Sequence, residues 1–419
     1  TLQRLGGGVT LAETVKELKL RHSDLLPENK RVRKGSLSDN TAAFSRARSR
    51  LPVEMVERFA KRVAQSLIEQ LPRCFGERRV FVLDGTTITL EPTSPLKKLY
   101  PPAKNQFGES VWPVLQLLVA HELRSGVAWI PELGAMYGDG NTSEAKLAAA
   151  IVTRIPNGSV VMGDSGFGIF GVLWATRSAG HDVLFRLTKQ RFRSLVRGAQ
   201  PLEPGFEIDS SGTIRNRDHA SWRLTWRPST KDRATHPHLP ANAMLDVFLH
   251  AVRLPNGEWL YLVTTLEMTA LDAAELYRRR YDVEFDIRDV KVTLDLESIR
   301  AKSDAMMRKE LLCGIVAYNL VQQLRHLAAK QVGVEPRRLS FTNVWTTMRI
   351  YVLELPPCSL SEWQSRYDRA LTSASRAKLP HRPNRSFPRQ AHPRRPKTTY
   401  EQRHKKSPPT STSPPDQTK

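Results

Sequence analysis

Apolar residues recur at helical spacing through the first 75 residues of the chain. Pro52 is a typical helix start, and residues 53–71 then carry apolar side chains at helical intervals. Ser38, Asp39 and Asn40 are typical N-cap residues before a shorter segment at 41–48. The pattern predicts a helical, basic region over residues 1–75. This region is interpreted either as a module that binds DNA ends or as an ordinary helical cap with a solvated face.

From residue 78 the pattern changes to short apolar, β-branched runs separated by helical segments. Strands are expected at 79–83, 114–119, 127–133, 160–162 and 182–185, and helices at 143–155 and 169–179. Ser143 is a candidate N-cap of the first of these helices. The alternation of strands and helices predicts an α/β fold, with residues 76–189 as the first part of its core.

The second half of the chain predicts four further regions. Residues 190–258 contain Gly, Pro, Thr and alternating apolar positions, which favours a β-rich insertion. A last core strand at 259–265 and a long helix from Thr269 to about Leu294 make up the region 259–300. A helix over 306–331 opens a C-terminal helical region, 301–375. The Pro-rich, basic stretch 376–419 is expected to be a disordered tail.

The net charge indicates a polyanionic partner. Lys and Arg number 64 against 42 Asp and Glu, which gives +22. Residues 376–419 hold 12 basic and 2 acidic residues, so the tail carries +10 and the remaining chain +12. A basic body as well as a basic tail favours nucleic acid as the partner.

Several classes of protein are excluded by composition. Three Cys residues without a CxxC pair exclude a disulfide framework and a structural zinc site, and they fit a reducing compartment. No run of 18 apolar residues is present, and residues 1–4 lack the apolar segment of a signal peptide. We therefore expect no membrane partner and a cytoplasmic location, associated with the nucleoid if the source is bacterial.

Three acidic residues stand where catalytic carboxylates are expected. Asp84 and Asp164 each lie next to a glycine at the predicted end of a strand, and ligand sites of α/β sheets lie beyond the carboxyl ends of strands. The third, Glu284, lies on the long predicted helix. At 100° per residue, Tyr277, Arg280, Glu284 and Lys291 fall within an arc of about 60°, beside an apolar stripe. Surface ion pairing along the helix is the alternative interpretation.

Three carboxylates and nearby cations suit a two-metal chemistry on DNA. Mg²⁺ prefers oxygen ligands, and two such ions can activate an attacking hydroxyl and stabilise the leaving oxygen. Arginine holds phosphate oxygens in a bidentate manner, and lysine adds a point charge. The sequence therefore predicts a metal-dependent site that acts on phosphodiesters.

Three motifs in this order resemble the signatures of the bacterial DDE insertion-sequence transposases, the group typified by insertion sequence four. The resemblance extends over roughly residues 35–330, and its most specific part is the spacing of the helical motif. The motifs are Asp84-Gly85-Thr86, Gly163-Asp164-Ser165-Gly166-Phe167 and Tyr277-x2-Arg280-x3-Glu284-x6-Lys291.

The resemblance implies an RNase H-like catalytic core interrupted by a β-rich insertion. It implies cut-and-paste movement of an insertion sequence by strand cleavage and strand transfer, on inverted-repeat ends and target DNA. It implies a homodimer in a synaptic complex, for which the region after Met306 is the expected contact. Asp84, Asp164 and Glu284 would be the catalytic ligands of Mg²⁺, with Mn²⁺ able to substitute.

The resemblance also implies DNA-phosphate contacts for Tyr277, Arg280 and Lys291. In relatives a tryptophan of the insertion stacks on a displaced base. Trp222 and Trp226 are candidates for that role, although burial in a core is the more common fate of such residues.

Other functions were weighed against the transposase. The Gly163-Asp164-Ser165-Gly166 segment, preceded by His121, also resembles the nucleophile region of chymotrypsin-like proteases, but the following residues and the helical content do not fit. No P-loop motif is present in the sequence. Two alternatives remain open: a transposase-derived DNA-binding protein without catalysis, and an RNase H-like nuclease without strand transfer.

Overall fold

The computed structural model describes residues 1–6, 9–71, 73, 75–106, 108–205, 207–208, 214–293, 299–353 and 358–380. Residues Thr1–Leu379 form one compact unit. Most of the predicted basic tail, residues 381–419, lies outside the described residues. No helix within the described ranges has the length and apolar character needed to cross a bilayer.

The strands of the main sheet carry the β-branched and apolar runs of the sequence. Its hydrogen-bonded order is β2-β3-β1-β5-β6-β12-β11-β10-β7, and β4 pairs with β3. Pairing is parallel for β1 with β5 and for β5 with β6, and antiparallel for the other neighbours. The strands are β1 (Val80–Thr89), β2 (Pro102–Asn105), β3 (Gly108–Glu122), β4 (Glu132–Ala135), β5 (Val160–Gly163), β6 (Asp182–Arg186), β7 (Gln200–Pro201), β10 (His219–Trp226), β11 (Leu245–Arg253) and β12 (Trp259–Thr264).

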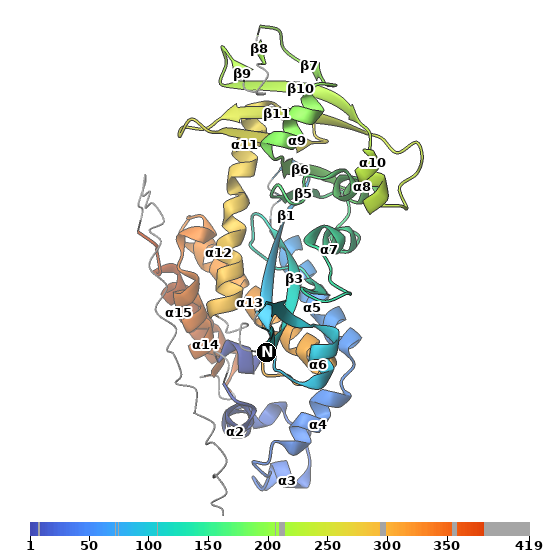
Figure 1. The fold of residues 1–419 in the computed structure, drawn as a ribbon. Helices are drawn as coiled ribbons and strands as arrows, with labels where there is room; N and C mark the ends of the chain where they lie inside the picture. Colours follow the sequence, from blue (N-terminus) through green and yellow to red (C-terminus); the bar gives the residue numbers. More distant parts are fainter. Residues whose placement is uncertain are drawn as a thin grey trace, which may run out of the picture. The chain divides into compact units, whose positions relative to one another are not determined.

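Helices precede, follow and cover this mixed sheet (Figure 1). A separate two-stranded sheet pairs β8 (Glu207–Ile208) with β9 (Ile214–Arg215). The α-helices are α1 (Leu2–Leu5), α2 (Leu11–Arg21), α3 (Lys30–Arg33), α4 (Ala42–Arg50), α5 (Val53–Glu69), α6 (Ser94–Leu99), α7 (Glu144–Ile151), α8 (Phe170–Ser178), α9 (Lys189–Val196), α10 (Thr230–Thr235), α11 (Ala270–Arg278), α12 (Asp282–Arg288), α13 (Asp304–Gln331), α14 (Phe341–Leu353) and α15 (Leu360–Ser375). Shorter helical turns are η1 (Ser23–Leu25), η2 (Arg279–Tyr281), η3 (Asp289–Thr293) and η4 (Pro336–Arg338).

Much of the predicted element order is confirmed. Helix α5 begins directly after Pro52, and the Ser143 side chain caps α7 by accepting a hydrogen bond from the backbone N–H of Lys146. Residues 190–258 contain β7 to β11, and also the helix α10. Strands β10 and β11 join the main sheet through β12.

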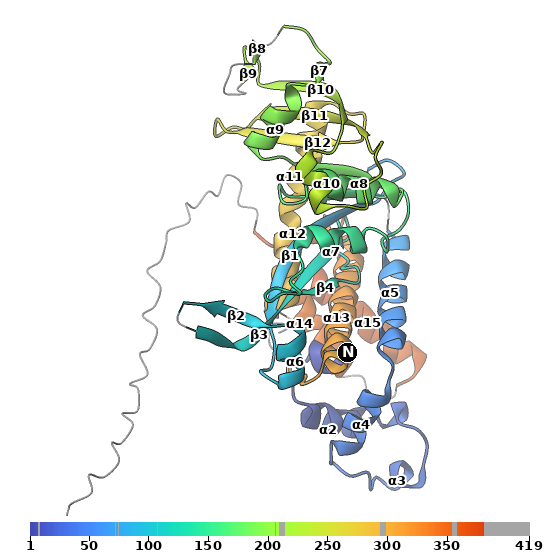
Figure 2. The same cartoon turned by 45° about the vertical axis from the view of Figure 1, so that its right-hand side comes forward.

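The first strand is longer than predicted, and this changes the position of Asp84. The apolar run predicts a strand that ends at Asp84, whereas β1 continues to Thr89. The continuation is held by β3, because β3 pairs with β1 from Phe81 to Thr89. Parallel pairing with β5 covers only Val80 to Val82. Asp84 therefore lies in mid-strand, where the β5 side of β1 has lost its partner. The β2–β3 hairpin extends away from the rest of the sheet (Figure 2).

The predicted strand at 127–133 is also wrong in its bounds, since β4 covers only Glu132–Ala135. The apolar residues before β4 are buried, and their backbone meets β3 only in an isolated bridge between His121 and Ala128, where the Val127 carbonyl accepts from the N–H of Glu122 and the N–H of Trp129 donates to the Ala120 carbonyl. The side-chain amide of Asn319 on α13 accepts from the N–H of Ala128 and donates to its carbonyl, both at 2.9 Å. The Asn319 side chain thus bonds the backbone groups of Ala128 that β3 leaves unbonded.

Helix α13 forms much of the interior of the helical region. Its buried side chains pack with residues of β3, α14 and α15 in one apolar cluster. The ammonium of Lys309 donates to the carbonyls of Arg48, Ser49 and Leu51, where α4 ends. Because most of α13 is buried within the chain, the exposed side chains of the described region after Met306 lie mostly in the loop that follows α13, on part of α14 and on α15.

Candidate active site

The alternation of side chains between the two faces of β1 determines the direction in which Asp84 points. Val80 and Val82 pack in an apolar cluster with Tyr277 and Val283, so their face of the strand, which Asp84 continues, looks toward α11 and α12. The backbone N–H of Gly85 donates to Oδ1 of Asp84 at 2.9 Å. Asp84 consequently stands at the open side of the sheet, facing the helix that carries Glu284.

Asp164 follows the last residue of β5, as the sequence predicted. Its Oδ1 accepts a hydrogen bond from the N–H of Gly166 at 2.8 Å, which fixes the side chain in the turn before α8. Asp84 and Asp164 interact electrostatically. The structure therefore brings these two predicted carboxylates together at the end of the β1–β5 pairing.

The predicted helix around Glu284 is divided into segments. Thr269 caps α11, as expected, by accepting from the N–H of Asp272 at 3.1 Å. The 3₁₀ turn η2 then separates α11 from α12, and the π-helical turn η3 follows. In Figure 1 the segments follow one another beside β1. Because the helical pitch changes at these turns, the four motif residues do not follow the single arc expected from an ideal α-helix.

The residues of the predicted helical motif have different environments. Tyr277 and Arg280 are buried, at 4% and 9% exposure, whereas the side chain of Glu284 is 45% exposed. Arg280 donates to Oε1 of Glu284 at 2.9 Å and also interacts electrostatically with Asp84 and Tyr277. Lys291 is half-buried on η3, about two turns beyond Glu284. Arg280 is thus the cation that links Glu284 to the carboxylate on β1.

A fourth carboxylate, Glu144 at the first position of α7, was missed by the sequence analysis. It reaches the sheet because Gly85 has no side chain: a Cβ there would overlap with the Glu144 carboxylate. Glu144 is hydrogen-bonded by Gln116 of β3 and interacts with both Asp84 and Asp164. The only sequence signal was the Asp-Gly pair, because a glycine in a strand can mark the close approach of another group.

The pKa values at this edge reflect burial and like charge. Burial raises the pKa of Asp84 to about 6, and the negative charges of Asp164 and Glu144 contribute in the same direction. Arg280 and the N–H of Gly85 oppose that rise. Burial also raises the pKa of Glu144, followed by the charge of Asp164. At Asp84, burial and like charge thus outweigh the opposing effect of Arg280, and raised carboxyl pKa values of this kind are a feature of functional sites.

The carboxylates are neighbours, but they do not form a completed metal cage. Across the described parts of the chain, no three His, Cys, Asp or Glu side chains are grouped so that they could hold a metal ion. The Glu284 carboxylate is instead paired with Arg280. The chemistry of the donors, all carboxylate oxygens, suits a hard divalent cation.

The two tryptophans of the predicted insertion lie in the core. Trp222 is 1% exposed and packs edge-on against Phe192, and Trp226 is 6% exposed and packs against Phe170. Their burial agrees with the more common interpretation and leaves neither ring face available for a base in this conformation.

Fold and site together define a mixed α/β protein with an acidic site at the open side of its sheet. The chain belongs to the transposase DDE domain family, whose model matches residues 75–320, more than half of the chain. No curated protein sequence matches it. A cryo-EM structure of a piggyBac transposase synaptic complex with hairpin DNA is similar at 9% identity and a TM-score of 0.36, over 70% of this chain. The match covers 57% of that transposase's own chain.

Proposed function

We propose that this protein is a DDE transposase that moves an insertion sequence by cut-and-paste, through metal-dependent strand cleavage and strand transfer. The transposase DDE domain match supports the chemistry. The strand order β3-β1-β5-β6, antiparallel first and then parallel, supports an RNase H-like core. The elements of residues 190–258 would be its insertion. The motif spacing supports membership of the group typified by insertion sequence four.

One observation carries the proposal. Asp84 and Asp164, 80 positions apart in the sequence, interact at the same open side of the sheet. Glu284, a further 120 positions along, is linked to Asp84 through the guanidinium of Arg280. The interaction of Asp84 with Asp164 and the connection of Glu284 to Asp84 through Arg280 support the assignment of the three motif acids to one site.

Asp84, Asp164 and Glu284 would hold the divalent ions, Mg²⁺ or Mn²⁺. When bound, these ions would activate the attacking hydroxyl and stabilise the leaving oxygen. The excess negative charge at the site fits such a cation. Arg280 now neutralises Glu284, and its guanidinium would become available for a DNA phosphate once Glu284 exchanges it for the metal. Tyr277 and Lys291 would make further phosphate contacts.

The partners proposed are the inverted-repeat ends of the element and the target DNA. The net charge of +22 supports a polyanionic partner. Two ends must be cut together, so the active form would be a homodimer in a synaptic complex. Action on chromosomal DNA would place it in the bacterial cytoplasm, at the nucleoid.

Glu284→Gln tests the function, because it keeps the size of the side chain and removes a metal-binding oxygen charge. We expect end cleavage in Mg²⁺ to fall by about 10⁴-fold, which corresponds to several kcal/mol of transition-state stabilisation. Binding of end DNA should change by less than about threefold. Cleavage by the Gln variant at the wild-type rate would refute the proposal. A plasmid integration assay separates a transposase from a nuclease, since only a transposase joins donor ends to target DNA.

The second candidate is a transposase-derived DNA-binding protein without catalysis. The ion pair between Arg280 and Glu284 favours it, because a paired glutamate is not free to bind metal. The same assay distinguishes it: this candidate predicts specific end binding and no Mg²⁺-dependent cleavage by the wild-type protein.

A further inference from the structure

A buried ionic network lies on the flank of α12 that faces away from Asp84. With Val283 as the reference at 100° per residue, Ile287 lies at about 40°, and both pack toward the sheet. Glu284 lies at about 100°, on the site flank, where Arg280 of η2 bonds to it. Asp282 and Asp286 lie at about −100° and −60°, on the other flank.

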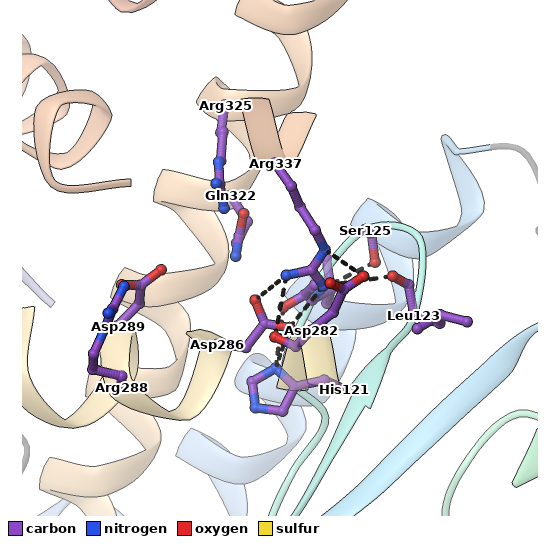
Figure 3. A network of polar contacts seen from close by, with 12 residues as sticks. His121, Leu123, Ser125, Asp282, Asp286, Arg288, Asp289, Gln322, Arg325 and Arg337 are labelled. Atoms are coloured by element: carbon purple, nitrogen blue, oxygen red, sulfur yellow. Dashed lines mark hydrogen bonds and ion pairs between the residues drawn. The ribbon is translucent and has the colours of Figure 1, made fainter. Parts of the chain in front are cut away.

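Arg337 of η4 binds both acids of that second flank (Figure 3). Its Nη1 and Nη2 donate to Oδ1 and Oδ2 of Asp286, each at 2.8 Å. Its Nε lies 3.3 Å from Oδ2 of Asp282, and Nη1 also donates to the carbonyl of Asp282 at 3.3 Å. Asp286 is only 1% exposed. A two-pronged, charge-assisted contact of this kind fixes orientation as well as distance.

The loop after β3 closes over the same contact. The Nδ1 atom of His121 lies 3.9 Å from Oδ2 of Asp286 and 3.1 Å from the carbonyl oxygen of Gly126. Gly126 adopts a φ of +67°, and a Cβ there would lie 3.2 Å from Oδ1 of Asp286 and 2.9 Å from Nε2 of Gln322. The loop, α12, α13 and η4 therefore meet at one buried carboxylate.

The helix bearing Glu284 needs such an external constraint. It has only seven residues in α-helical geometry, and it is flanked by the 3₁₀ turn η2 and the π turn η3. Both kinds of turn have poorer hydrogen-bond geometry than an α-helix. Rotation of α12 about its axis would move Glu284 and its partner Arg280 relative to Asp84. The packing of Val283 and Ile287 keeps α12 against the sheet, whereas the directional bonds from Arg337 fix its rotation.

We propose that Arg337 is a positioning residue for Glu284: by binding Asp282 and Asp286, it fixes the rotation of α12 at which Glu284, paired with Arg280, lies on the Asp84 side of the helix. Arg337 does not touch the site itself. The inference rests on the proposed function, since it assigns to Glu284 a role in metal binding.

Arg337→Lys is the direct test, because lysine keeps the positive charge beside Asp286 but lacks the guanidinium that donates to both of its carboxylate oxygens. Arg154→Lys is the matched control: Arg154 also bridges two carboxylates, Glu57 and Glu132, away from the site. Mn²⁺ affinity of the full chain with end DNA is measured by the paramagnetic resonance signal of free Mn²⁺, alongside melting temperature and cleavage.

For Arg337→Lys we expect Mn²⁺ affinity to fall by about tenfold, the effect typical of groups that orient metal ligands. The Mn²⁺ concentration for half-maximal cleavage should rise by a similar factor, with end binding unchanged. Arg154→Lys should leave Mn²⁺ affinity within about twofold. Equal Mn²⁺ affinities in the two variants would overturn the inference, whatever their melting temperatures. If Arg337→Lys does not fold, Asp282→Asn, which keeps the Asp286 contact, should still lower Mn²⁺ affinity severalfold. A different result would contradict the proposed function itself: a wild-type protein that neither binds Mn²⁺ nor cleaves end DNA.

Discussion

The two flanks of α12 face groups of acidic residues in different electrostatic environments. On the network flank, Asp286 is buried and bound by both prongs of Arg337. On the site flank, Asp84, Asp164 and Glu144 crowd together with Arg280 as their buried cation. Buried charges are normally paired, so the first arrangement holds structure, whereas the second has a deficit that a bound cation would correct. The difference separates the acids that build the fold from those available for chemistry.

The largest expected effect comes from removing the ion pair between Arg337 and Asp286 on the network flank. Arg337→Ala should lower the free energy of unfolding by about 3–5 kcal/mol, because it leaves the charge of Asp286 buried without its partner. The double variant Arg337→Met, Asp286→Leu should recover most of this loss, since it removes both charges. Urea unfolding of the three proteins gives the answer. If the free energy of unfolding of Arg337→Ala lay within about 1 kcal/mol of the wild-type value, the ion pair between Arg337 and Asp286 would not stabilise the fold.

The next largest expected effect is on cleavage, and it comes from removing the charge of Glu144 on the site flank. Glu144→Gln should lower cleavage by about 10–100-fold, the range for groups that support metal ligands, with end binding and melting temperature retained. Asp139→Asn, an exposed acid in the loop before α7, is the control and should have no effect. Cleavage by Glu144→Gln equal to that of the control would remove Glu144 from the site.

The contrast between the flanks also shows what the sequence could and could not predict. The predictions of Asp164 after β5 and of the cap at Thr269 are confirmed, because both depend on local signals: an apolar run that ends, and a side chain that bonds to its own helix. The extent of β1 was wrong because antiparallel pairing with β3, a distant contact, continues the strand past Asp84. Local pattern carries no information about which partner a strand finds.

The missed residues share the same cause. Glu144 reaches the site by packing over Gly85 of a distant strand, and Arg337 bonds to Asp286, which lies 51 positions earlier in the sequence. Neither has a local motif, and each resembles an ordinary helix-terminal charge in the sequence. The helical arc correctly placed Arg280 next to Glu284, since residues four apart share a face. It could not show that η2 and η3 interrupt the helix, because those turns depend on tertiary packing.

The smallest expected effect concerns pH and the free energy of unfolding of the metal-free protein. Because the pKa of Asp84 is raised to about 6 in the folded state, against about 3.9 when unfolded, its favourable contribution is complete below about pH 4 and is lost as the pH rises through 6. Asp84→Asn should therefore raise the free energy of unfolding at pH 7 by about 1–2 kcal/mol, after a discount for partial exposure. The gain should disappear at pH 4. Urea unfolding at both pH values measures this gain, and an equal change at the two would contradict the account in which burial, with like charge, raises the pKa of Asp84. Excess Mg²⁺ should reverse the sign at pH 7, because the ion binds the folded wild-type carboxylates and stabilises that state.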